Sequence, residues 1–171
     1  MQGFFTKAQQ IRWFLVSGVV ATLAGESYGL GVMSINMAKH IDKLEDDKSR
    51  GVGTFPVRVG ESAARRVDQF AVVVIYVVLA YLVFVAHYFT PVMLVVFFAL
   101  KEAITLLKVL NKPKPPQAPE GWPAWPAWFS GFAFQHNRQF GAYILIGLIV
   151  DALLHVIPIT NDLINRYWPP L

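Results

Sequence analysis

A polar stretch between two apolar runs holds four of the eleven acidic residues in the chain. It reads His40-Ile-Asp-Lys-Leu-Glu-Asp-Asp-Lys-Ser-Arg50 and continues Gly-Val-Gly-Thr-Phe-Pro-Val-Arg-Val-Gly60. If the stretch begins as a helix, Asp42 and Asp46 stand at i and i+4 and present both carboxylates on one face. Two hard oxygen ligands one turn apart suit Mg²⁺, which keeps several waters and takes further ligands from a substrate phosphate.

Basic and amide side chains surround these acids. Lys48 and Arg50 are interleaved with them and are suited to hold the remaining charge of a bound phosphate. Asn36 and Lys39 precede Asp42 by one to two turns and are expected at the mouth of the same site. The alternative is a solvated loop of mixed charge with no ligand, and the charge pattern alone leaves both interpretations open.

The composition points to a membrane. The 171 residues are 55% hydrophobic and only 15% charged, which is too apolar for an ordinary soluble domain. The chain has no cysteine, which excludes a disulfide framework and thiolate chemistry. Its net charge of +4 comes from basic residues in loops beside apolar spans, which favours a membrane surface and anionic ligands over nucleic acid.

The apolar runs predict an all-α protein with one transmembrane helical domain over residues 1–171. A bilayer needs about 20 apolar residues for each helical span. The expected spans are 13–38, 70–87, 91–110 and 140–157, joined by polar loops at 39–69 and 111–139. Six prolines within 111–128 exclude a regular helix there.

Two expected spans contain carboxylates. Glu26 lies near the middle of the first, where it is either a functional group or a partner in an internal polar contact. Asp151 and His155 share a face of the last span. Because two ligands make a poor metal site, we expect a polar contact between helices for this pair. A small transporter using Glu26 and Asp151 is a weaker possibility, since neither has an evident path of polar neighbours.

Charge asymmetry predicts the orientation. Four spans place both loops on one side, and the termini with the 87–91 turn on the other. The loop side holds eleven basic residues: Lys39, Lys43, Lys48, Arg50, Arg58, Arg65, Arg66, Lys108, Lys112, Lys114 and Arg138. The other side holds Lys7, Arg12 and Arg166. The positive-inside rule therefore predicts a multi-pass protein of the cell membrane, or inner membrane, with the aspartate loop in the cytoplasm.

The segment 39–60 resembles the second aspartate-rich motif of the UbiA-type membrane prenyltransferases. In that family an acidic cluster is followed by a basic residue, a glycine and the string Thr-Leu-Pro/Ala-Val-x-x-Gly. In this chain the end of the pattern is present as Thr54, Pro56, Val57 and Gly60. Phe55 stands in the place of the leucine. Counting back from this end of the pattern makes Asp47 the last carboxylate of the motif, whereas DxxxD spacing selects Asp42 and Asp46. All three are therefore candidate metal ligands.

The resemblance implies the C-terminal half of a nine-helix bundle. It further implies Mg²⁺-dependent transfer of a prenyl group from an isoprenoid diphosphate to a hydrophobic acceptor, aromatic or lipid. Lys39, Lys48 and Arg50 would then contact the diphosphate. The first motif of the family, Asn-Asp-x-x-Asp-x-x-x-Asp, is not found in these residues. We therefore expect the chain to function together with a missing N-terminal half or a partner membrane subunit, and to be surrounded by membrane lipids. The alternative is a noncatalytic membrane subunit that retains the motif as a relic.

Overall fold

In this computed structural model the described residues are 7–169, apart from the side chains at positions 7–17, 20 and 21. The basic side chains of Lys7 and Arg12 thus lie outside the described residues. Residues 7–169 contain helices and no strand, which confirms the all-α prediction. The elements are α1 (Lys7–Asp42), α2 (Leu44–Ser49), α3 (Phe55–Val59), α4 (Glu61–Phe84), the 3₁₀ helix η1 (Pro91–Ala99), α5 (Leu100–Leu110), α6 (Phe129–Val156) and α7 (Pro158–Tyr167).

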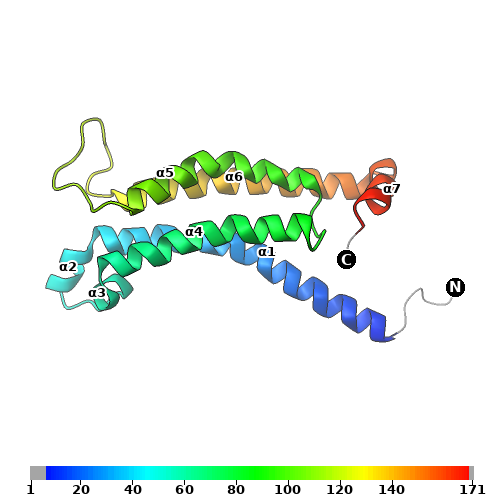
Figure 1. Cartoon of the computed structure of the whole chain (residues 1–171), viewed down its shortest axis with the longest axis horizontal. Coiled ribbons are helices and arrows are strands. Elements are labelled where there is room, and N and C mark those ends of the chain that lie inside the picture. The colour runs from blue at the N-terminus through cyan, green and yellow to red at the C-terminus, as the bar shows by residue number, and fades with distance from the viewer. Residues whose placement is uncertain (1–6, 170–171) are drawn as a thin grey trace.

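The long helices form a bundle. α1 packs along α4 and α6, and α6 also packs against η1 and α5. Figure 1 shows α4 beside the C-terminal half of α1, and α5 alongside α6. The core between them is apolar and includes Val72, Ile75, Leu79, Leu82, Met93, Val96, Leu106, Phe129 and Phe140.

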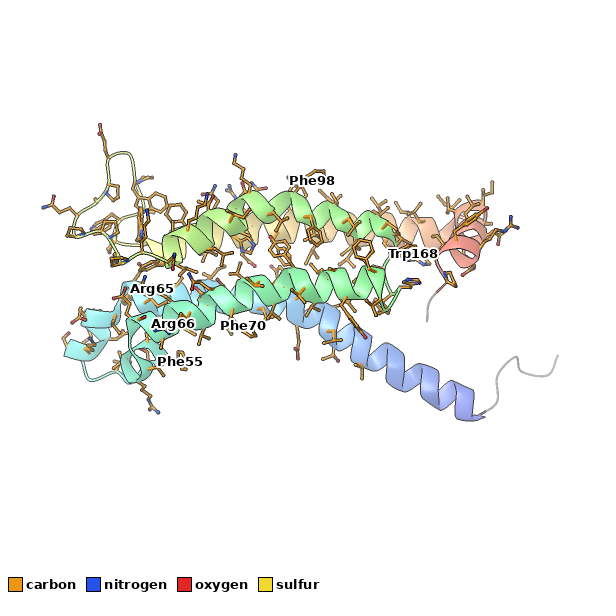
Figure 2. The ribbon with its side chains drawn as sticks, viewed as in Figure 1. Phe55, Arg65, Arg66, Phe70, Phe98 and Trp168 are labelled. Atoms are coloured by element: carbon orange, nitrogen blue, oxygen red, sulfur yellow. The ribbon has the colours of Figure 1, made fainter. Side chains whose placement is uncertain are left out.

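The outer surface of the bundle is apolar as well. On α4 the exposed stripe consists of Phe70, Val73, Val77, Tyr81 and Phe84. Figure 2 shows Phe70 and Phe98 pointing away from the bundle. A helix that is apolar all round is typical of a membrane span. Among the described residues, α4 and α6 are long and apolar enough to cross a membrane. The spans expected at 13–38 and 91–110 stay predictions.

Helix boundaries differ from the predicted spans. α4 begins at Glu61 rather than at residue 70, and Glu61 pairs with Arg65 one turn later (3.3 Å). α6 begins at Phe129 rather than at residue 140. Its polar segment does not end the helix, because His136 turns into the bundle, where its Nε2 lies 2.9 Å from Tyr76 Oη. Much of the predicted loops 39–69 and 111–139 is therefore helical. A polar residue does not end a helix when a neighbour in the bundle supplies its hydrogen-bond or ion-pair partner.

Residues 111–128 contain no helix or strand, as their prolines predict. The third expected span begins as the 3₁₀ helix η1 and continues as α5. α7 was not predicted from the sequence.

The polar contact between segments that was predicted for Asp151 and His155 is confirmed for Asp151, whereas the Nδ1 atom of His155 lies 2.8 Å from the carbonyl oxygen of Asp151 in its own helix. Asp151 Oδ1 accepts hydrogen bonds from the backbone N–H of Thr90 (2.8 Å) and from Thr90 Oγ1 (2.5 Å). Thr90 is the residue that precedes η1, and η1 has no side-chain cap of its own. Asp151 on α6 therefore caps the start of η1 and joins two segments that are 61 residues apart.

Candidate functional site

A break in the helix separates the two aspartates that were expected to share one face. α1 ends at Asp42 and α2 begins at Leu44, with Lys43 between them outside helical geometry (ψ 13°). Asp42 and Asp46 therefore belong to different helices, and the predicted common face is not formed. The physical reason is that the carboxylate of Asp42 is drawn to the N-terminus of another helix.

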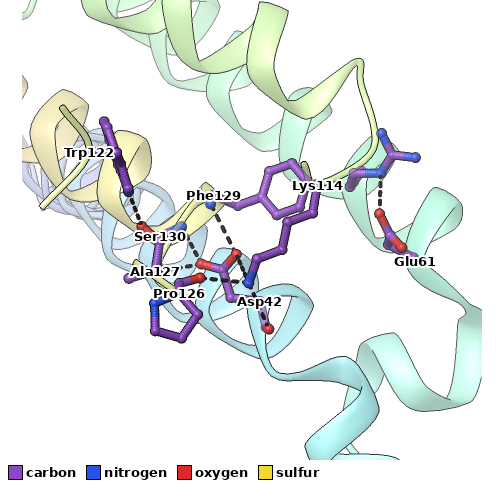
Figure 3. Close-up of polar contacts among 9 residues, drawn as sticks. Asp42, Glu61, Lys114, Trp122, Pro126, Ala127, Phe129 and Ser130 are labelled. Carbon is purple, nitrogen blue, oxygen red and sulfur yellow. Dashed lines mark hydrogen bonds and ion pairs between the residues drawn. The ribbon is translucent and has the colours of Figure 1, made fainter. Parts of the chain in front are cut away.

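Asp42 caps α6 from outside that helix (Figure 3). One carboxylate oxygen accepts the backbone N–H of Phe129 (3.1 Å). The other accepts the N–H (2.9 Å) and the Oγ (2.7 Å) of Ser130. The helix offers no side-chain cap of its own, and the carboxylate is only 5% exposed. Asp42 thus satisfies N–H groups that have no partner within α6 and places a negative charge at the positive end of its dipole.

Lys114 completes this contact. Its Nζ lies 3.3 Å from Asp42 Oδ1 and donates hydrogen bonds to the carbonyl oxygens of Asp42 (3.2 Å) and Pro126 (2.6 Å). It also lies 5.0 Å from the ring centroid of Trp125, within the range of a cation–π contact. The proline-rich segment 111–128 is therefore fastened to the end of α1 by one lysine. From the sequence, Lys114 was expected only as a basic loop residue.

Asp47 is also used within the fold. Its Oδ2 accepts a hydrogen bond from Thr54 Oγ1 (3.2 Å) and lies 3.2 Å from His40 Nδ1. The side chain is 13% exposed. Asp47 therefore holds the glycine-containing turn that links α2 to α3 against the end of α1.

Asp46 remains accessible. It is exposed and pairs with Arg50 at 2.9 Å, while Lys48 pairs with Glu45 at 2.8 Å. Exposed ion pairs of this kind contribute only about 0–1 kcal/mol, so a ligand of higher charge density can replace them. Asp46, Lys48 and Arg50 are thus available to a metal ion or an anion at little cost.

A groove runs between α1 and α6. Its end near the motif is a cavity of about 470 Å³, lined by Ile35, Lys39, Asp42, Lys43, Pro126, Ala127, Ser130, Gly131 and Phe134. Next to it lies a second cavity of about 460 Å³, lined by Tyr28, Phe134, Asn137, Arg138, Gly141, Ile144, Leu145 and Leu148. Phe134 contributes to both. The first cavity is mainly apolar, with Lys39, Lys43 and Asp42 at its end near the motif, and the second combines apolar side chains of α6 with Asn137 and Arg138.

The predicted residues fall into three groups, the third being Asp47, which is held by His40 and Thr54. Lys39 and Asp42 line the groove. Four residues lie on the exposed surface of α1 and α2, outside the described lining of the two cavities: Asn36, Asp46, Lys48 and Arg50. Sequence reasoning missed Lys43 as a lining residue, and its position directly after Asp42 was the signal that could have found it.

The donor set fits Mg²⁺ only in part. Within residues 7–169, no group of three or more histidine and carboxylate side chains is arranged to hold a metal ion. Proteins usually bind Mg²⁺ with one or two carboxylates together with waters and phosphate oxygens. Asp46 is exposed and suits this role, whereas the adjacent Asp47 is turned toward His40 and Thr54. A metal ion at the motif would therefore need further oxygen ligands besides these residues.

The aromatic residues of segment 111–128 pack on the start of α6. Trp122 stacks on Phe132 (centroids 4.6 Å apart) and donates its Nε1–H to the carbonyl of Ala127 (3.1 Å). Trp128 packs edge-on against Trp122, with ring centroids 5.2 Å apart. These contacts hold residues 126 and 127 as one wall of the first cavity.

A comparison with known protein families agrees with an apolar helix bundle that carries the aspartate motif. The model of the UbiA prenyltransferase family matches residues 4–120, which include the aspartate motif and more than half of the chain. No curated protein and no solved structure gives a significant match. The motif, the apolar bundle and the extent of the family match together show that the chain belongs to the UbiA prenyltransferase family.

Proposed function

We propose that this chain forms part of a Mg²⁺-dependent prenyltransferase that moves a prenyl group from an isoprenoid diphosphate to an aromatic or lipid acceptor. Family membership supports prenyl transfer in general. The observation that carries the more specific proposal is the groove, because basic side chains (Lys39, Lys43 and Arg138) lie beside apolar side chains along its length. Such a groove suits a substrate with an anionic head and a long hydrocarbon tail.

The head of the substrate would lie at the end of the groove near the motif. There Lys39 and Lys43 would bind diphosphate oxygens, and Arg50 and Lys48 would reach them from the exposed turn after exchanging their present carboxylate partners. Asn36, on the exposed side of α1, would donate a further hydrogen bond. Charge-assisted bonds from these residues would orient the diphosphate and stabilise the negative charge that develops as it leaves.

Asp46 and Asp47 are the proposed metal ligands, and Asp42 joins them if its bonds to α6 are exchanged. A bound Mg²⁺ would offset the charge of the leaving diphosphate. The tail of the donor would lie against Ile144, Leu145 and Leu148, which keep water away from the reacting carbon. Because these carboxylates make only part of a site, a further membrane segment that carries acidic residues would complete it.

The proposed location is a cell membrane or inner membrane, with several spans and the aspartate motif in the cytoplasm. Asp42, Lys114 and the start of α6 meet at one end of the bundle, which brings the two basic loops together. The positive-inside rule then supports placing this end in the cytoplasm, where a soluble prenyl diphosphate is available.

The experiment measures Mg²⁺-dependent transfer of a radiolabelled prenyl diphosphate in native membranes that contain the full chain. Asp46→Asn and Asp47→Asn should each reduce transfer at least tenfold, and the double change Lys39→Ala with Lys43→Ala should raise KM for the diphosphate. Glu120→Gln, an exposed carboxylate in segment 111–128, is the matched control and should retain full activity. Full activity in both aspartate variants would reject the proposal.

A noncatalytic membrane subunit is the second candidate. It is favoured by the observation that all three motif carboxylates already have partners within the chain. In that case Asp46→Asn would change neither the activity of the complex nor the association of the chain with it, whereas Asp42→Ala would weaken that association by loosening the fold.

A further inference from the structure

α7 begins where the apolar part of α6 ends. From Phe140 to Ile157 the chain has 18 residues without a basic side chain other than His155. At 1.5 Å per residue this segment is about 27 Å long, close to the hydrocarbon thickness of a bilayer of about 30 Å. Ile157 then leaves helical geometry (ψ 120°), and Pro158 starts α7. The ten residues of α7 therefore follow directly after the point where a spanning α6 would reach the membrane surface.

One face of α7 is fastened to the bundle. The single Oγ1–H of Thr160 has two acceptors within reach, the carbonyl oxygens of Leu154 near the end of α6 (2.5 Å) and of Ile157 just before α7 (2.9 Å). After the helix, Trp168 Nε1 donates to the carbonyl of Phe89 (3.1 Å). The Trp168 ring also stacks on His87, with centroids 4.5 Å apart. These contacts hold the two ends of α7, and the half-buried residues Thr160, Asn161 and Ile164 mark the side of the helix that faces the bundle. Figure 2 shows Trp168 at the end of the bundle.

The exposed surface of α7 is divided into an apolar and a polar stripe. Ile159, Leu163 and Tyr167 recur every four residues and are 75%, 49% and 71% exposed. At 100° per residue they cover an arc of about 80°, next to the face that contacts the bundle. The adjoining arc consists of the exposed polar residues Asp162, Asn165 and Arg166. Such a division is that of a helix lying in a membrane–water interface.

The apolar stripe continues a surface that already faces outward. Leu153, Val156 and Ile157 at the end of α6 are 54%, 77% and 47% exposed, and Ile159 follows them. α6 is one of the two described helices able to cross a membrane. The same lipid that covers the outer surface of α6 therefore reaches the apolar stripe of α7 without a gap.

We propose that α7 lies along the lipid surface at the end of the bundle opposite the aspartate motif. Ile159, Leu163 and Tyr167 insert among the upper acyl chains, and Asp162, Asn165 and Arg166 face the headgroups and water. Since the opposite charges of Asp162 and Arg166 offset each other, a zwitterionic bilayer is a sufficient partner. This placement goes beyond prenyl transfer and does not depend on it.

The test uses the absence of cysteine in the natural chain. Single cysteines are introduced as Ile159→Cys and Leu163→Cys on the apolar stripe, and as Asp162→Cys and Arg166→Cys on the polar stripe. Each full-length variant is labelled with a nitroxide and reconstituted into phosphatidylcholine vesicles. Collisions of the label with oxygen, which concentrates in lipid, and with a water-soluble nickel chelate then report its surroundings.

Labels at 159 and 163 should collide more often with oxygen than with the chelate, and labels at 162 and 166 should show the reverse. All four positions are exposed, so these substitutions remove no core packing. Equal access of the chelate to all four labels would overturn the proposal, because α7 would then lie in water. Protection of 159 and 163 from both reagents would also overturn it, because a protein would then cover the stripe.

Discussion

Replacing Asp42 by alanine tests whether this aspartate holds the end of α6 in place. The change removes the acceptor for the N–H groups of Phe129 and Ser130 and the negative partner of Lys114. Losing an N-cap costs about 1 kcal/mol, and losing one partner of a buried ion pair costs about 3–5 kcal/mol. These contributions overlap, and Lys114 is 22% exposed, so the lower end applies. We expect Asp42→Ala to lower the free energy of unfolding by about 3 kcal/mol.

Thermal unfolding of the purified chain in detergent micelles measures this loss. For a chain of this size about 3 kcal/mol corresponds to a fall in Tm of roughly 6–12 °C. Asp46→Ala is the matched control, since it removes an exposed carboxylate whose ion pair with Arg50 contributes less than about 1 kcal/mol. Equal and small shifts in the two variants would refute the assignment of Asp42 as the cap of α6.

A double-mutant cycle measures how much of this loss in the free energy of unfolding comes from the interaction of Asp42 with Lys114. Lys114→Met keeps an unbranched apolar side chain and removes the charge, and with it the contact of Nζ with Trp125. If the pair acts as one unit, the coupling energy with Asp42→Ala should be about 1–3 kcal/mol. Hydrogen exchange at Ser130 should rise in both single variants, because each loosens the same N-terminal turn.

Two further predictions concern packing inside the bundle. Gly31→Ala should cost about 1–3 kcal/mol, because the added Cβ would overlap Asn137 Oδ1, whereas Gly29→Ala has open space around it and should be neutral or stabilising. Thermal unfolding in detergent compares the two, and a Gly31→Ala protein as stable as the Gly29→Ala protein would contradict the close packing of α1 on α6. Asp68→Asn should leave stability unchanged or raise it, because this carboxylate is fully buried on α4 and neither of its oxygens has a hydrogen-bond partner among the described residues. A marked loss in the same assay would show that the negative charge of Asp68 is needed.

Long apolar runs and prolines are the features of this sequence that predicted the structure well. Both exclude alternatives through local physics: an apolar run of 18 residues needs an apolar environment, and a proline cannot continue a helix. The helical class and the irregular segment 111–128 followed from them. The helix boundaries did not, because α4 begins with polar residues that pair with one another, as Glu61 does with Arg65, and because the polar segment of α6 turns His136 into the bundle.

The partners of Asp42 were beyond the reach of sequence reasoning. An aspartate that caps its own helix has a local signature, since its acceptor oxygen and the donor N–H groups lie within three residues. Asp42 instead meets donors 87 and 88 residues away on α6. The same charge pattern would fit an aspartate facing solvent or a metal ion, and only the packing of α1 against α6 decides between them.

Asp42 and Asp151 perform the same task at opposite ends of the bundle. Asp42 joins α1 to the start of α6, and Asp151 joins the far part of α6 to the start of η1. In an apolar environment an unpaired N–H group costs several kcal/mol, so each junction strongly resists sliding of α6 along its neighbours. The groove between α1 and α6 has this helix as one wall, and its shape therefore depends on both junctions. For the same reason metal binding by Asp42 would have a structural consequence: withdrawing the carboxylate from α6 would release the wall formed by residues 126–131 and open the end of the groove near the motif.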